Sequence, residues 1–193
     1  MMYKMVLMIF TIIIVMIFYS CEKSTNDLVT PPQSKNLLTN SSFEINASPK
    51  MTGWILSEKD TTILRYLLRF STDVPPGGGK SSIVVNCSFP GPWRIYQLIP
   101  ANAGSHIYRL SFWARNFFGQ GKVTLGLKTT MDTVINLHTV RPVDSLWTFY
   151  NMFDTVTAEV NDSLVVIINS GYVGVTMLGG GTWFDVVRLE GLY

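Results

Sequence analysis

The residues that could carry out chemistry are few, and their spacing matches no common catalytic motif. The two histidines, His106 and His138, have no nearby cysteine or acidic cluster, as a zinc site or a nucleophile–base pair would need. Residues 77–81 read Gly-Gly-Gly-Lys-Ser, as at the end of a phosphate-binding loop, but Val74 stands where that motif has its first glycine. Glycoside hydrolysis needs only two carboxylates, and no acid here lies in a recognisable cleft motif. We expect that the protein is not an enzyme.

Sugar binding is a second kind of chemistry, and the chain has the residues for it. A sugar ring is held by aromatic side chains with amides, acids or arginine beside them. For each aromatic residue the alternative is packing in the core, where large rings bury much area. The candidate ligand-binding residues are Trp93, Tyr96, Gln97, Trp113, Arg115 and Tyr150.

The elements that would position these residues are strands. Residues 107–115 alternate, which places Tyr108, Leu110, Phe112 and Ala114 on one face and Trp113 and Arg115 on the other. Residues 122–127, 163–168 and 183–189 also predict strands, and turn residues separate them. Only residues 61–70 could form a helix. Many short strands without helices between them predict an all-β sandwich or barrel.

The N-terminal residues predict export from the cytoplasm. Lys4 precedes an apolar run that ends before Ser20 and Cys21, which indicates a signal peptide over residues 1–20. The segment resembles a bacterial lipobox, and that resemblance implies a lipid on Cys21 and membrane attachment through it. The alternative is an uncleaved anchor, although the run is shorter than the roughly 20 residues that span a bilayer. We expect a location in the bacterial cell envelope, at the outer membrane or cell surface.

Composition and cysteine content limit the remaining possibilities. Residues 21–35 are polar and predict a flexible tether, which leaves one domain over residues 36–193. The net charge is +2 and there is no basic run, so we expect no nucleic acid partner. If Cys21 carries lipid, Cys87 has no partner for a disulfide and is expected to be a buried thiol.

Several short motifs, taken in order, resemble one family. Residues 36–44 (Asn-Leu-Leu-Thr-Asn-Ser-Ser-Phe-Glu) and the following Gly53-Trp54 resemble the opening of carbohydrate-binding modules with the galactose-binding-like jelly-roll fold. Later segments match that family's pattern in the same order. They are residues 79–83 (Gly-Lys-Ser-Ser-Ile), 96–99 (Tyr-Gln-Leu-Ile), 108–115 (Tyr-Arg-Leu-Ser-Phe-Trp-Ala-Arg), 147–150 (Trp-Thr-Phe-Tyr) and 183–189 (Trp-Phe-Asp-Val-Val-Arg-Leu). The resemblance implies a jelly-roll β-sandwich whose first strand, residues 37–44, lies close to its last, residues 183–189.

The same resemblance implies a structural calcium ion. The family often holds Ca²⁺ between a glutamate on the first strand and an aspartate on the last, positions that Glu44 and Asp185 occupy here. Such an ion takes about six or more oxygen ligands, several of them backbone carbonyls. The family's second acid is Val186 in this chain, so the alternative is that Glu44 and Asp185 are ordinary acidic residues.

We therefore expect a non-catalytic, lipid-anchored, glycan-binding module. The glycan is expected on the face that carries Trp113 and Arg115, with the other candidate residues as neighbours. The alternative is a structural or adhesive β-sandwich lipoprotein that contacts a protein partner.

Overall fold

The computed structural model describes residues 34–57, 68–86, 94–170 and 180–192. The chain divides into two compact units, residues 1–33 and 34–193, and every described residue belongs to the second. The predicted signal peptide, Cys21, Cys87, Trp93 and all but the last two residues of the tether lie outside the described residues. None of the described residues forms a helix long and apolar enough to cross a membrane.

The described part of the chain is built from twelve strands and contains no helix. The first six are β1 (Glu44–Ile45), β2 (Ser48–Pro49), β3 (Ile55–Leu56), β4 (Leu68–Ser71), β5 (Ser82–Asn86) and β6 (Arg94–Pro100). The others are β7 (Gly104–Phe117), β8 (Lys122–Lys128), β9 (Val134–Val140), β10 (Thr148–Ala158), β11 (Ser163–Asn169) and β12 (Gly181–Leu192). The all-β prediction is confirmed. The segment with a helix option ends in β4, and its residues 61–67 lie outside the described residues.

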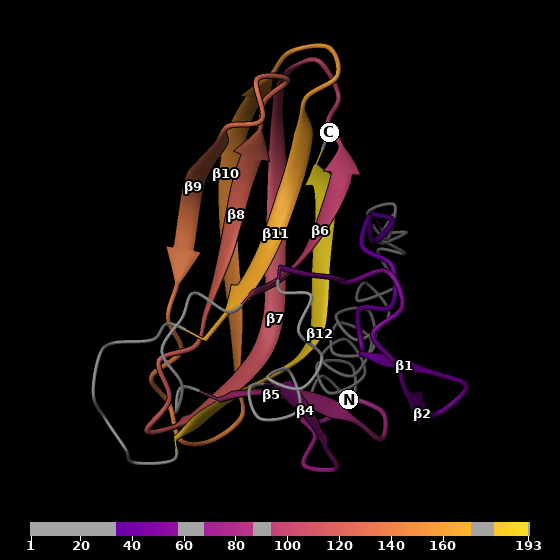
Figure 1. The fold of residues 1–193 in the computed structure, drawn as a ribbon, viewed down its shortest axis with the longest axis vertical. Helices are drawn as coiled ribbons and strands as arrows, with labels where there is room; N and C mark the ends of the chain where they lie inside the picture. The colour runs from indigo at the N-terminus through magenta and orange to yellow at the C-terminus, as the bar shows by residue number, and fades with distance from the viewer. Residues whose placement is uncertain (1–33, 58–67, 87–93, 171–179, 193) are drawn as a thin grey trace, which may run out of the picture. The chain divides into compact units, whose positions relative to one another are not determined.

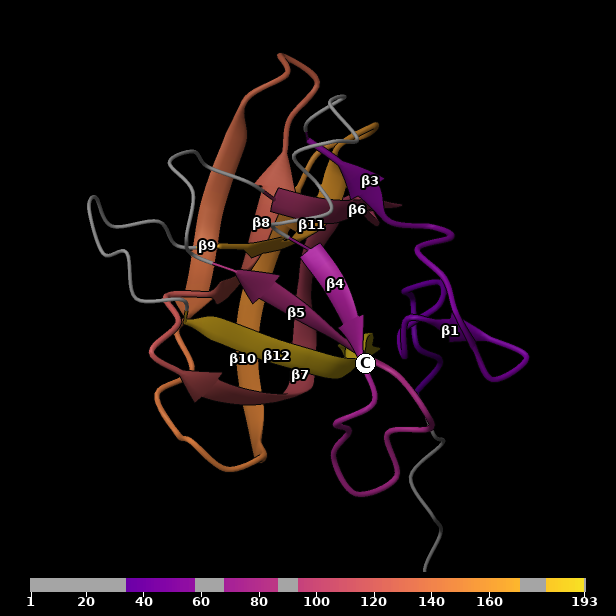
Figure 2. The ribbon, with the colours of Figure 1, turned by 60° about the horizontal axis from the view of Figure 1, so that its bottom comes forward.

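Two five-stranded antiparallel sheets stack face to face. The first sheet has the order β10-β7-β12-β5-β4, and the second has the order β3-β6-β11-β8-β9. The second sheet faces the viewer in Figure 1, and in Figure 2 the first sheet comes forward. A separate hairpin pairs β1 with β2. This two-layer arrangement confirms the predicted jelly-roll sandwich.

The core between the sheets follows from alternation along the strands. On β7, Tyr108, Leu110, Phe112 and Ala114 are buried, as the sequence predicts, because successive side chains of a strand point to opposite faces. Facing residues of the second sheet are equally buried. They are Ile95 and Ile99 of β6, Val123, Leu125 and Leu127 of β8, and Leu164, Val166 and Ile168 of β11.

The two ends of the domain meet, as the resemblance implies. The N–H of Leu37 donates to the carbonyl of Leu189 at 2.7 Å, and the N–H of Val187 donates to the carbonyl of Ser41 at 2.9 Å. The expected first strand is wrong in its detail, however. Residues 38–43 follow bends and turns, with positive φ at Asn40 (50°) and Phe43 (57°), and only Glu44–Ile45 is a strand. Left-handed residues interrupt the extended backbone that a strand needs.

A β-bulge in β12 sets which of its side chains reach the core. Its register with β7 shifts between Asp185 and Arg188, and Val186 has a φ of +49°. Phe184, Val187 and Leu189 are all fully buried. Plain alternation from Phe184 would turn Val187 outward, so one extra residue is required. The bulge leaves Asp185 on the opposite side of the first sheet from the core.

Candidate functional site

The two predicted metal ligands converge on a glycine turn. Gly78 and Gly79 lie in the loop between β4 and β5, and a Cβ atom on Gly78 would collide with Oδ2 of Asp185. A Cβ atom on Gly79, whose φ is +79°, would collide with the carboxylate of Glu44. The N–H of Lys80 donates to both oxygens of Glu44, at 3.2 Å and 3.1 Å. Only residues without side chains leave room here for both carboxylates.

The carboxyl group of Asp185 is buried and incompletely bonded. The N–H of Val186 donates to its Oδ1 at 2.7 Å, whereas its buried Oδ2 has no hydrogen-bond partner among the described residues. Burial, together with a smaller effect of the negative charge of Glu44, raises the pKa of Asp185 from its ordinary 3.8 to about 8. The carboxyl group must therefore carry a proton or face a cation at neutral pH.

Trp113 and Arg115 lie on the outer face of the first sheet, as predicted, but Arg115 is already engaged. Its guanidinium pairs with Asp73 at 2.7 Å and stacks over the ring of Trp183 at 4.4 Å from the centroid. The indole N–H of Trp147 donates to the same carboxylate at 2.8 Å. These contacts hold the loop that contains Gly78 and Gly79 against the sheet, so Arg115 has a structural role here.

A second ion-pair cluster covers the far end of this face. Glu190 is almost fully buried and pairs with Arg109, and with Arg188 at 3.1 Å. Burial alone would raise the pKa of Glu190, but the hydrogen bond and charge of Arg109, together with the charge of Arg188, hold it below its usual value. Between the two clusters, the ring of Trp113 lies 5.5 Å from that of Phe149.

Gln97 and Tyr150 do not lie on this face. Gln97 is buried on the core side of β6. Its side-chain amide nitrogen donates to the carbonyl of Thr39 at 2.7 Å, and its amide oxygen accepts from the Thr39 N–H at 3.0 Å. The ring of Tyr150 stacks on Phe112 at 5.4 Å, and its hydroxyl donates to Asp144 at 2.6 Å. Their assignment to a shared ligand face was wrong in geometry, because alternation along β6 and β10 turns both side chains toward the core.

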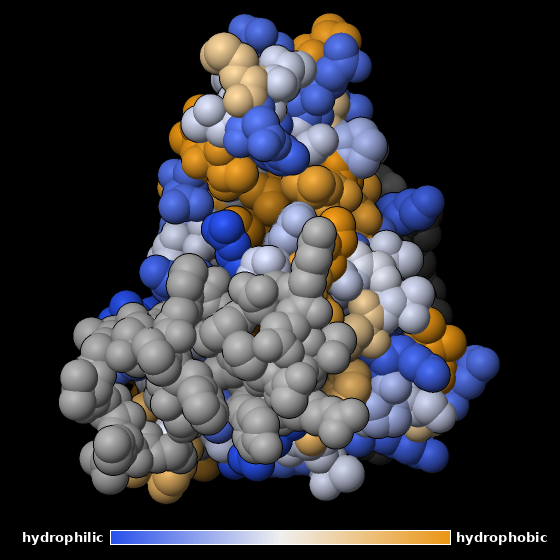
Figure 3. Space-filling view, in the orientation of Figure 1, coloured by the Kyte–Doolittle hydropathy of each residue, from blue (hydrophilic) through white to orange (hydrophobic). Residues whose placement is uncertain are grey.

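Tyr96 borders a cleft on the outer face of the second sheet. The cleft has a volume of about 310 Å³, within the range of small-ligand sites. Val165 and Ile167 form its nearly buried floor, and Leu98 is partly exposed at 38%. Apolar residues gather over this face in Figure 3. The lining residues are Ser57, Arg94, Tyr96, Leu98, Lys128, Asp132, Val134, Val165 and Ile167.

The cleft has hydrogen-bonding groups at both ends. Arg94 lies beside Asn169 of β11, and Lys128 lies beside Ser163, six residues earlier on the same strand. That separation is about 20 Å at the usual rise of a strand. Lys128 pairs with Asp132 at 2.7 Å, whereas Arg94 has no ion pair with any residue in the described ranges. The arrangement suits an elongated polar ligand with an apolar face.

Sequence reasoning found Tyr96 but missed the rest of this cleft. The continuous apolar run of β11 gives no sign of which residues face outward, and Val165 and Ile167 emerge only from the pairing of β11 with β6 and β8. The available signal for this cleft was the alternation of residues 94–100. It buries Ile95, Gln97 and Ile99 and leaves the residues between them on the outer face.

Comparison with known proteins supports the fold. No protein-family model matches the sequence, and no curated protein does. Among solved structures, a family 61 carbohydrate-binding module in complex with β-1,4-galactotriose has a TM-score of 0.54 and 16% identity, covering 81% of this chain and 98% of that one. A family 16 module has a TM-score of 0.55 and 15% identity over 80% of this chain and 99% of that one.

One similar structure comes from a larger protein. The enzymatically active domain of tailspike protein 4 of bacteriophage CBA120 has a TM-score of 0.59 and 19% identity, covering 81% of this chain. The match spans only 21% of that tailspike chain. The similar structures are mostly carbohydrate-binding modules, so the chain has the jelly-roll fold of that class of protein.

The buried acid predicts an unusual dependence of stability on pH. When a chelator removes calcium, the folded state keeps the proton of Asp185 up to about pH 8. The unfolded state releases that proton near pH 4. The melting temperature should therefore fall as the pH rises from 5 to 7.5, by about 3 °C per pH unit. Differential scanning calorimetry measures this slope.

The control for this measurement is Asp185→Asn, which keeps the shape and removes the titration. Its melting temperature should be nearly flat over the same range. Equal slopes in the two proteins would show that Asp185 is not a buried acid of raised pKa.

Proposed function

We propose that this protein is a non-catalytic glycan-binding module of the bacterial cell envelope. The observation that supports it best is the cleft on the outer face of the second sheet. Tyr96 offers an aromatic ring, Val165, Ile167 and Leu98 an apolar surface, and Arg94, Lys128 and Asp132 polar groups. Sugars present apolar C–H faces and polar edges, and this combination of residues matches them.

A protein partner is the competing proposal, and the outer face of the first sheet favours it. Ile107, Phe149 and Phe153 are exposed there at 47%, 51% and 53%. Exposed apolar residues gathered on one face are typical of interaction surfaces. A domain that binds no sugar and self-associates or captures a protein through this face would be an adhesive β-sandwich.

Two substitutions test which of the two outer sheet faces binds the glycan. Tyr96→Ala should weaken glycan binding about fivefold or more, since one aromatic contact supplies on the order of 1 kcal/mol or more. Trp113→Ala should leave binding unchanged, because that ring lies on the first sheet. Affinity electrophoresis of the full chain in gels that contain polysaccharide measures both effects, with β-1,4-galactan as one probe. Loss with Trp113→Ala alone would return the site to the face predicted from the sequence.

We also propose that Glu44 and Asp185 hold a calcium ion. The orphaned Oδ2 of Asp185, the nearby charge of Glu44 and the space above Gly78 and Gly79 fit a cation. The described residues contain no cluster of three or more acidic, histidine or cysteine side chains. Backbone carbonyls would supply the remaining ligands, as they often do for Ca²⁺.

Calcium should therefore stabilise the protein. At pH 7.5, calcium at about 100 times its dissociation constant should add about 2.7 kcal/mol relative to chelator, which is about 5–10 °C in melting temperature. Asp185→Asn should not respond to calcium, and in chelator it should be at least as stable as the wild type. An unchanged wild-type melting temperature in excess calcium would remove the site.

Lipid attachment at Cys21 completes the proposal, and the apolar run before Ser20 supports it. Cys21→Ala should release the protein from the membrane fraction or block processing, and Cys87→Ala should do neither. Fractionation with mass spectrometry of the N-terminus measures both. A Cys21→Ala protein that stays membrane-bound with residues 1–20 intact would indicate an uncleaved anchor.

A further inference from the structure

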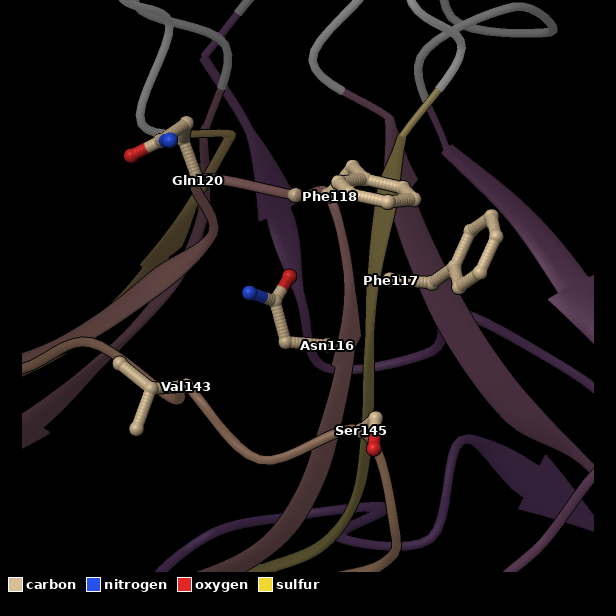
Figure 4. A pocket seen from close by; sticks show the side chains of 7 residues that line it. Asn116, Phe117, Phe118, Gln120, Val143 and Ser145 are labelled. Atoms are coloured by element: carbon tan, nitrogen blue, oxygen red, sulfur yellow. The ribbon is translucent and has the colours of Figure 1, made fainter.

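A larger cavity lies at another place in the domain, where β7 leads into β8 and the β9–β10 loop passes by. Its volume is about 530 Å³. In Figure 4 the rings of Phe117 and Phe118 lie together, and the side chains of Asn116 and Val143 lie to one side of them. The lining residues are Asn116, Phe117, Phe118, Gly119, Gln120, Val143 and Ser145, which we call the end pocket. It shares no residue with the cleft at Tyr96.

Two phenylalanine rings stand at the rim of the end pocket. Phe117 is 56% exposed and Phe118 is 72% exposed. Their rings meet edge to face, with centroids 4.8 Å apart and planes at 70°, a favourable arrangement for an aromatic pair. The pair holds the two rings in a defined orientation while leaving much of both surfaces open to a ligand.

The backbone beneath Phe118 is strained and tightly supported. Its φ is +52°, in the left-handed region that bulky residues rarely adopt. Its backbone bridges Gly181, and a Cβ atom on Gly180 would lie 2.5 Å from its carbonyl carbon. A strained conformation persists only where its surroundings enforce it, and such residues cluster at ligand sites.

The polar groups of the end pocket are all uncharged. The side-chain oxygen of Asn116 accepts from the hydroxyl of Thr182 at 3.2 Å, which fixes the amide. Its nitrogen lies on the side of Val143 and Gln120 in Figure 4. Gln120 and Ser145 add a second amide and a hydroxyl. Since none of the described residues that line the pocket is charged, a charged ligand would find no counter-ion among them.

We propose that the end pocket is a second ligand site, which binds the terminal ring of an uncharged sugar. The apolar C–H face of the ring would stack on Phe118, and its hydroxyls would bond to the amides of Asn116 and Gln120. The two sites are independent, so this inference does not require that the Tyr96 cleft binds glycan.

The end pocket and the N-terminal segment lie at different ends of β12. The N-terminal segment joins β12 at Leu189, through the bond from Leu37, whereas Phe118 bridges Gly181 at the start of the same strand. These points are eight residues apart on β12, which is about 25 Å. The end pocket therefore lies well away from the place where the chain enters the domain.

Saturation-transfer NMR on the full chain tests the proposal, with β-1,4-galactotriose, cellotriose and xylotriose as probes. In a Tyr96→Ala background, which removes the cleft's ring, at least one uncharged trisaccharide should still bind. Adding Phe118→Ala should reduce that binding at least tenfold, and Phe118→Trp should retain it. The matched control is Phe153→Ala, a 53% exposed phenylalanine on β10, which should have no effect.

The outcomes distinguish the two sites. Binding that is lost with Phe118→Ala but insensitive to Tyr96→Ala would leave the end pocket as the sugar site and remove the cleft. Binding that Phe118→Ala affects no more than Phe153→Ala would overturn the end-pocket proposal alone. An unchanged melting temperature of Phe118→Ala would confirm that the loss reflects the missing ring and not unfolding.

Discussion

The placement of one buried carboxyl group organises the first sheet. β12 lies between β7 and β5, and the bulge at Val186 is what keeps Val187 and Leu189 in the core while Asp185 points the other way. Two partly independent sets of contacts close over Asp185. The bond from Val187 to Ser41 brings in the N-terminal segment that carries Glu44, and the pairing of Arg115 with Asp73 holds the glycine loop.

The two outer faces of the sandwich consequently differ in what they can offer to a ligand. On the first sheet, the charged side chains are largely committed to the protein itself, in the Arg115–Asp73 and Arg109–Glu190–Arg188 contacts. In the second sheet, one edge strand, β3, is only two residues long, and an open cleft lies beside Tyr96. A buried charged side chain is tolerated only when a partner of opposite charge pairs with it. Side chains that are paired in this way are not available to bind a glycan.

The sequence predicted the parts of this structure that depend on local pattern. Alternation along residues 107–115 placed Phe112 inside and Trp113 outside, and motif order identified the class of fold. It could not predict that β6 lies in the second sheet, which separates Gln97 from Trp113, or that Tyr150 pairs with the buried Phe112 and so faces the core. Nor could it predict the bulge at Val186 or the strained turn at Phe118, because both depend on close approach to glycines distant in the sequence or on pairing across the sheet.

Glycan binding to the outer face of the second sheet can be located directly by NMR. Backbone amide shifts of the isotope-labelled protein would be followed during titration with the oligosaccharide that binds best. We expect the largest changes in β6, β8 and β11, around Tyr96, Lys128 and Val165, with little change at Trp113. Shifts confined to the outer face of the first sheet, or no shifts with any glycan at millimolar concentration, would contradict the proposal.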